Sequence, residues 1–285
     1  ARIAGCQEIV LCTPPTDNGK IHPAILYAAS VAGVDCICKV GGSQAIAAMA
    51  YGTETVPKVY KIFGPGNQYV TAAKQWVSLK DVAIDMPAGP SEVEVIADAS
   101  AHPDFMSQAE HGKDSQAMMI TTDLSIVEPL VDAIQKQLEK LPRKSITEQA
   151  LSHSRIIVLK DKQEIIDFTN LYAPEHLIIQ TADYAAIAGQ IRNAGSVFMG
   201  EYTPESAGDY ASGTNHTLPT NGYAHAYSGV NLDSFIKKMT FQEINANGIR
   251  SLGKTICVMA ENECLEAHRN AVIVRLKTIE QDETI

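Results

Sequence analysis

Short apolar runs alternate with longer segments of helical periodicity along most of the chain, which is typical of a parallel α/β fold. The apolar runs predict strands at residues 8–12, 36–40, 59–63, 92–97, 117–121, 155–159, 177–180 and 196–199. The periodic segments predict helices at residues 22–32, 44–51, 68–79, 126–140, 163–171 and 184–193. One further helix, between the 92–97 and 117–121 strands, carries Gln108 and His111.

The pattern changes at two places. Residues 85–91 hold two prolines and a glycine, which exclude regular structure there. From about residue 231 onward the chain is mostly helical, at residues 241–252, 261–269 and 271–279. We therefore expect two Rossmann-like α/β domains with parallel sheets and a small helical C-terminal tail domain, with the boundaries 1–90, 91–230 and 231–285. The tail cannot bury its own apolar faces, so we expect it to dock on another subunit.

Composition excludes some function classes. The 285 residues include 33 acidic and 23 basic ones, and the formal net charge of -10 argues against a nucleic-acid partner, which needs a basic face. No apolar stretch approaches the roughly 20 residues of a membrane helix, so we expect no membrane partner. The six cysteines form no Cys-x-x-Cys pair, which fits reduced thiols in a cytoplasmic protein.

Two glycine-rich loops, residues 41–43 and 64–67, each follow a predicted strand and open a helix. Such loops suit phosphate groups, because backbone N–H groups at a helix N-terminus face the anion. Neither loop matches the dinucleotide or Walker pattern, so tight strand-to-helix turns are the simpler explanation. Gln44 and Asn67 begin the following helices, where helix capping is the alternative role.

Two polar pairs could carry chemistry. Gln108 and His111 lie three residues apart, which places them on one face of a helix as possible oxygen and nitrogen metal ligands, although a structural role ranks first. Glu175 and His176 could form an acid/base pair. Neighbours in a regular strand point to opposite faces, so the pair needs irregular backbone, which Pro174 favours. A salt bridge at the strand end is the alternative.

The loop at residues 201–223 is crowded with Gly, Ser, Asp, Asn and His. Long ordered loops in α/β domains are usually functional and follow the carboxyl ends of strands, where open sheets bind ligands. Asp209 is a candidate functional residue there, and His216 is expected near the site without an assigned role.

Taken together, these segments resemble the histidinol dehydrogenase family. The resemblance rests on motifs that follow the family's order through nearly the whole chain, at residues 63–67, 84–93, 108–112, 174–177, 204–206, 218–219 and 267–272. Individually some are weak, but together they are highly specific. The family oxidises L-histidinol through L-histidinaldehyde to L-histidine, the last two steps of histidine biosynthesis, with NAD and one zinc per site.

The resemblance implies a role for each matching residue. The zinc ligands would be Gln108, His111, Asp209 and His268, and the general bases would be Glu175 and His176. The substrate contacts would be Ser91, Glu263, His176 and the zinc ligands, and the NAD contacts would be Gln44 and Asn67. The family is homodimeric, so His268 and Glu263 would complete the partner's site.

The chain departs from the family in two ways. It begins at Ala1, directly before a core-like strand, so we expect that a preceding N-terminal region is missing and that both α/β domains are incomplete. That region supplies the family with a tyrosine at the NAD pocket. Residues 104–107 also form a shorter stretch than the family has before its zinc-binding glutamine, which could shift Gln108 and His111.

Two alternatives stay open at this stage. A zinc-dependent amidohydrolase would use Glu175 to activate a zinc-bound water and would not need Gln44 and Asn67. An inactive homologue that only binds its ligands would have lost activity with its N-terminal part.

Overall fold

A computed structural model describes residues 1–87, 89–101 and 105–282, and Asp104 of the shortened stretch lies outside these ranges. The chain divides into two compact units, Ala1–Ile236 and Lys237–Ile285. The finer boundaries at residues 90 and 230 stay a prediction.

The first part of the larger unit contains two strand–helix–strand repeats. Strands β1 (Val10–Cys12) and β2 (Cys36–Cys38) pair in parallel around α1 (Pro23–Ala32), and β3 (Lys61–Ile62) and β4 (Ala83–Ile84) pair in parallel around α3 (Gln68–Ser78). Helix α2 (Gly42–Tyr51) lies between the repeats in sequence. The pattern predicted three strands in this part, at residues 8–12, 36–40 and 59–63, which we took as one unit. That grouping is wrong, because β3 pairs with β4, a short strand that the pattern did not predict, and the four strands form two separate sheets.

The rest of the unit is built on a five-stranded parallel sheet with the order β7-β6-β5-β8-β9. Its strands are β5 (Glu92–Ala97), β6 (Gln116–Thr121), β7 (Arg155–Val158), β8 (His176–Gln180) and β9 (Ser196–Met199). All five were predicted, since strands covered on both faces read as continuous apolar runs. The parallel α/β class is confirmed.

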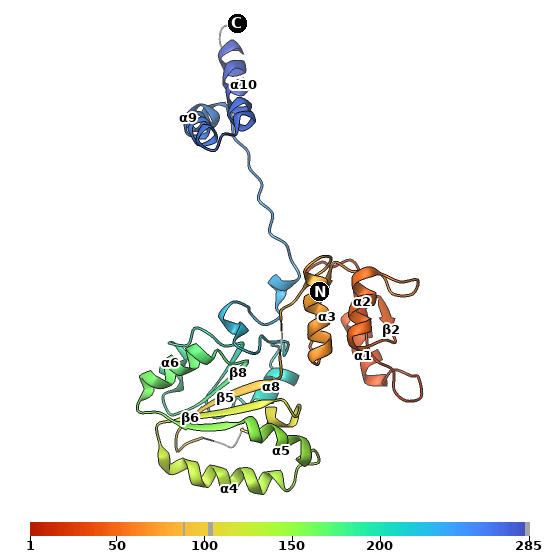
Figure 1. Ribbon diagram of the computed structural model, residues 1–285, viewed down its shortest axis with the longest axis vertical. Helices are drawn as coiled ribbons and strands as arrows, with labels where there is room; N and C mark the ends of the chain where they lie inside the picture. The colour runs from red at the N-terminus through yellow and green to blue at the C-terminus, as the bar shows by residue number, and fades with distance from the viewer. Residues whose placement is uncertain (88, 102–104, 283–285) are drawn as a thin grey trace. The chain divides into compact units, whose positions relative to one another are not determined.

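Helices cover both faces of this sheet, as Figure 1 shows. Helices α4 (Val127–Leu138) and α5 (Lys144–His153) lie on one face, over a core that includes Val95, Met119 and Ile178. Helices α6 (Lys162–Tyr172) and α7 (Tyr184–Ala188) lie on the other face, over Ile96, Ile120 and Ile179. Neighbouring residues of β5 thus belong to opposite cores, as the strand period requires.

The smaller unit is a pair of helices, α9 (Ala246–Asn262) and α10 (Glu266–Asp282). Three helices were expected, with one of them over residues 261–269, and that expectation is wrong. The chain breaks inside this segment, where Cys264 takes a left-handed conformation with φ 58°. Glu263 therefore ends α9, and His268 lies in the first turn of α10. No helix among the described residues is both long enough and apolar enough to cross a bilayer.

Candidate functional site

Glu175 and His176 lie together at the amino-terminal end of β8. Helix α6 ends at Tyr172, and Ala173 follows in a left-handed conformation with φ 54°, so Glu175 precedes the regular strand. This irregular backbone lets both side chains meet, and Glu175 Oε2 lies 3.6 Å from His176 Nδ1. Both residues are buried, with 5% and 3% exposure. The backbone N–H of Glu92 donates to Glu175 Oε2 over 2.9 Å and fixes the carboxylate.

The surroundings of His176 make its imidazole a stronger base. Burial lowers the pKa of His176, but the hydrogen bond and negative charge of Glu175, with the charge of Glu205, outweigh burial and raise the pKa above its ordinary value. Its Nε2 atom is buried and has no hydrogen-bond partner among the described residues. The ring also stacks on Phe198, with centroids 5.9 Å apart. The imidazole is therefore held in place with one nitrogen available to a ligand.

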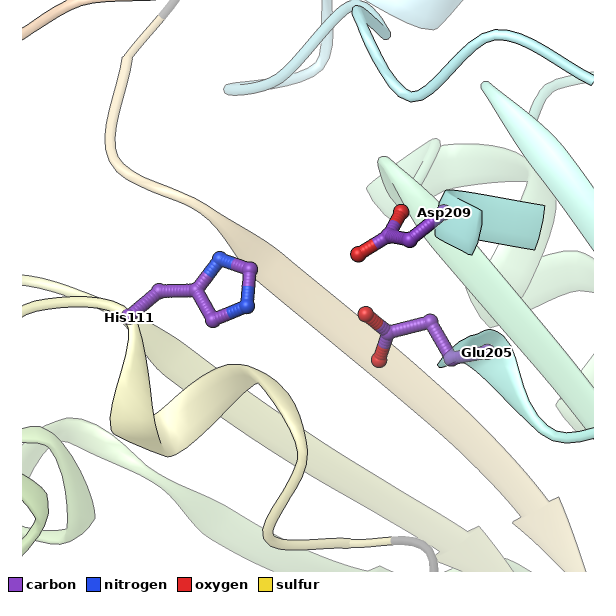
Figure 2. Close-up of side chains that lie close together, drawn as sticks. All are labelled: His111, Glu205 and Asp209. Atoms are coloured by element: carbon purple, nitrogen blue, oxygen red, sulfur yellow. The ribbon is translucent and has the colours of Figure 1, made fainter. Parts of the chain in front are cut away.

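Three side chains could together hold a metal ion. One donor atom each of His111, Glu205 and Asp209 lies within 4.8 Å of the others, and Figure 2 shows the three side chains pointing toward one another. Glu205 and Asp209 come from α8 (Glu205–Tyr210), one helical turn apart. His111 follows a short 3-10 helix, Gln108–Glu110, where a longer helix was expected.

Glu205 connects this cluster to Gln108. The carboxylate accepts a hydrogen bond from Ser107 Oγ over 2.6 Å and another from Gln108 Nε2. Glu205 and Gln108 are almost fully buried, with 2% and 1% exposure. Burial raises the pKa of Glu205, although the charge of His176 and these hydrogen bonds oppose the rise. Sequence analysis assigned no role to Glu205, although this residue lies in the 204–206 motif, directly after Pro204 at the start of a helix.

The donor set fits zinc. Imidazole nitrogen and carboxylate oxygen are common zinc ligands in catalytic sites, which leave a position open. Gln108 adds a further oxygen, because its Oε1 atom is buried without a hydrogen-bond partner among the described residues. A buried acceptor left without a donor is costly, and a cation would satisfy it.

The site lies at the amino-terminal edge of the five-stranded sheet, where ligands of open sheets are not usually found. Ser91 directly precedes β5, and Val93 of that strand pairs with His176 at the start of β8. The expectation that residues 201–223 build a site at the carboxyl ends is therefore wrong. The loop leaves β9 there but returns across the sheet, and the Asn221 N–H donates to Glu92 Oε1 over 3.0 Å. Gly208 permits this path, since a Cβ atom there would lie 2.6 Å from the Phe198 ring.

Strand β5 carries two buried glutamates on the face of the sheet that packs against α6. Glu92 and Glu94 point toward α6 and are buried, with 8% and 0% exposure. Burial, and then the negative charge of Glu175, raise the pKa of Glu92 to about 7. Burial raises the pKa of Glu94 to about 8, although its hydrogen bond from Thr169 Oγ1 opposes the rise. The other oxygen of Glu94 has no hydrogen-bond partner among the described residues. Neither carboxyl was predicted to be buried.

The predicted cofactor contacts lie elsewhere in the larger unit. Gln44 is exposed in α2, and Asn67 is exposed at the start of α3. Asn67 caps that helix, because its Oδ1 accepts from the backbone N–H groups of Tyr69 and Val70. The structure therefore bears out the capping role for Asn67, and its contact with a cofactor stays a prediction.

A buried ion pair fixes the loop before Asn67. The Lys74 ammonium pairs with the Asp85 carboxylate, and both side chains are at most 5% exposed. Lys74 Nζ donates to the Gly64 carbonyl over 2.8 Å, and the Gly64 N–H donates to Asp85 Oδ2 over 2.8 Å. The pair thus holds both backbone groups of the first loop glycine.

The remaining candidates are exposed residues. His216 is exposed in the 201–223 loop. His268 and Glu263 are exposed in the smaller unit, so their roles stay predictions.

Comparison with known proteins relates this arrangement to one family. The family model for histidinol dehydrogenase matches residues 1–276. A histidinol dehydrogenase of Bacteroides fragilis is 67% identical over 284 residues, which cover 98% of this chain and 66% of the relative. A chloroplastic histidinol dehydrogenase of Arabidopsis thaliana is 56% identical over 291 residues, which cover 98% of this chain and 62% of the relative.

The same likeness holds in three dimensions. The crystal structure of histidinol dehydrogenase from Elizabethkingia anophelis superposes with a TM-score of 0.95 at 58% identity, over 98% of this chain and 66% of that one. The chain thus spans slightly less than two thirds of the length of these relatives. The amidohydrolase alternative and the inactive homologue receive no support from these matches.

Proposed function

The chain belongs to the histidinol dehydrogenase family, and from that premise we propose that it serves the NAD-dependent oxidation of L-histidinol through L-histidinaldehyde to L-histidine. The observation that carries this proposal is the buried Glu175–His176 pair beside the donor cluster of His111 and Asp209. Both lie in the segment that matches the family.

The first oxidation uses His176 as a general base. It takes the proton of the substrate hydroxyl while the carbon-bound hydrogen leaves as hydride to NAD. Its Nε2 atom suits this role, since it is buried and has no partner among the described residues. Glu175, 3.6 Å from Nδ1, stabilises the imidazolium that forms.

The second oxidation uses Glu175. The carboxylate removes a proton from a water molecule, which adds to the aldehyde carbon to give the hydrate. The hydrate then loses a hydroxyl proton to a base of the site and its carbon-bound hydrogen as hydride to a second NAD, which leaves the carboxyl group of L-histidine. The aldehyde stays bound between the two steps, since a free aldehyde would react elsewhere.

Zinc is held by Gln108, His111, Asp209 and His268 in this proposal. When bound, it supplies a Lewis acid that orients the imidazole nitrogen and the amine of the substrate. Ser91 and Glu263 add substrate contacts, and Glu263 matches the positive charge of the substrate. Supporting this set, Gln108 and His111 both approach α8, which carries Asp209.

Gln44 and Asn67 contact NAD in this proposal. They belong to helices that follow the two glycine-rich loops. The protein acts as a cytoplasmic homodimer, in which the helical tail of one subunit brings His268 and Glu263 to the partner's site.

The test is NADH formation from L-histidinol, followed by its absorbance, with and without a zinc chelator. Activity that the chelator removes and zinc restores is the expected result. A zinc-loaded dimer that forms no NADH would refute the proposal, and one that binds zinc and histidinol without reducing NAD would be an inactive binding homologue.

A further inference from the structure

Among the described residues, Glu205 is the one buried carboxylate that contacts a proposed zinc ligand and has no part in the proposed reaction. It is 2% exposed and receives hydrogen bonds from two side chains, Ser107 Oγ and Gln108 Nε2. It also lies in the donor cluster with His111 and Asp209. An acid buried this deeply needs a structural or functional reason.

The amide of Gln108 creates a need that Glu205 can meet. A glutamine amide has an oxygen that accepts and an NH₂ group that donates, and only the oxygen can bind a cation. An ionised carboxylate is an acceptor only, so it pairs with the NH₂ group and not with the oxygen. The hydrogen bond from Gln108 Nε2 to Glu205 therefore selects one of the two amide orientations.

The selected orientation leaves Gln108 Oε1 without a hydrogen-bond partner among the described residues. Gln108 is 1% exposed, so solvent does not satisfy this atom. An oxygen that is held in a buried position without a donor is prepared for a cation.

We propose that Glu205 is a positioning residue of the metal site, which holds the Gln108 amide so that its oxygen faces the ion. This inference rests on the proposed function, since it takes Gln108 as a zinc ligand. Glu205 acts through Gln108 and is not itself required as a ligand. Partners of this kind typically change metal affinity by about 10- to 100-fold when they are removed.

The experiment compares zinc affinity in three variants of the full chain, by competition with a chromophoric chelator. Glu205→Ala removes the acceptor, and we expect zinc affinity to fall about 10- to 100-fold. Glu205→Gln keeps an amide oxygen that can accept a hydrogen bond from Gln108 Nε2, and its NH₂ group can donate a hydrogen bond to Ser107 Oγ. We therefore expect zinc affinity within a few-fold of the parent. Glu128→Ala removes an exposed carboxylate and is the matched control, with no expected change.

The spectrum of bound Co²⁺ gives a second readout, which a purely structural role would not move. We expect the Glu205→Gln spectrum to match the parent and the Glu205→Ala spectrum to change, because one oxygen ligand is lost. If the alanine variant does not fold, Glu205→Ser takes its place, since it leaves room for water to reach Ser107 and Gln108.

Two results would overturn the inference. Parental zinc affinity in Glu205→Ala would show that Gln108 needs no positioning. A loss in Glu205→Gln as large as in Glu205→Ala would make Glu205 a direct ligand or an essential charge. A parent chain that binds no zinc would instead refute the proposed metal site itself, so the two failures are distinguishable.

Discussion

The buried carboxyl of Glu94 makes the free energy of unfolding depend on pH. Glu94 is fully buried in the central strand β5, and one of its oxygens has no partner among the described residues. Burial raises its pKa from 4.5 to about 8. Between these values the folded protein keeps the proton that the unfolded chain releases, so the stabilisation from Glu94 is full below pH 4.5 and is lost as pH rises toward 8.

The magnitude follows from the size of this shift. Each pKa unit corresponds to about 1.36 kcal/mol, so a shift from 4.5 to about 8 lowers the free energy of unfolding by about 5 kcal/mol above pH 8. Glu94→Gln removes the ionisation and keeps an oxygen that can accept from Thr169 Oγ1. We therefore expect the variant to match the parent near pH 4.5 and to exceed its stability by several kcal/mol at pH 9.

The assay is urea denaturation followed by circular dichroism at pH 5, 7 and 9. Glu128→Gln, which neutralises an exposed carboxylate, is the control and should follow the parent at every pH. If the difference between Glu94→Gln and the parent were the same at all three pH values, the ionisation of Glu94 would not set the pH dependence, and the reasoning would be wrong.

Three further predictions concern the site and the cofactor loop. His176→Asn should slow NADH formation by about 10²- to 10⁴-fold while the zinc content stays at the parental level, since the base is lost and no proposed ligand is removed. Gly195→Ala should reduce activity on the order of 10²-fold, because its Cβ atom would lie 2.5 Å from the Glu175 carbonyl oxygen and displace the backbone that carries Glu175 and His176. An unchanged kcat would contradict this. Lys74→Met should lower the free energy of unfolding, measured by urea denaturation, by about 3–5 kcal/mol, because it leaves the charged Asp85 carboxylate buried without its cation. The double variant Lys74→Met/Asp85→Asn should recover part of that loss, since the uncompensated charge is removed.

Periodicity predicted the five-stranded sheet because its strands are buried on both faces and carry an uninterrupted apolar signal. It missed α5, since Thr147 and Ala150 are its only buried residues and its sequence is mostly polar. It also missed the break between α9 and α10, because Cys264 takes a left-handed conformation that glycine or asparagine would usually mark.

Local sequence signals predicted two parts of the candidate site, but only the order of motifs along the chain joined them into one site. Adjacency in the sequence suggested Glu175 with His176, and spacing suggested Gln108 with His111. The approach of Glu205 to Gln108 joins segments 97 residues apart in the chain, and no local pattern encodes such a contact. The position at the amino-terminal edge was unpredictable for the same reason, since it depends on a loop that crosses the sheet after β9.

Gln108 Oε1 and His176 Nε2 have no hydrogen-bond partner among the described residues, and on the proposed function they would link folding to metal and substrate supply. A ligand that satisfies them binds the folded chain and not the unfolded one. At a free concentration of 100 times its dissociation constant, it would raise the free energy of unfolding by about 2.7 kcal/mol. If zinc binds as proposed, cells short of zinc would hold a larger unfolded fraction of this protein.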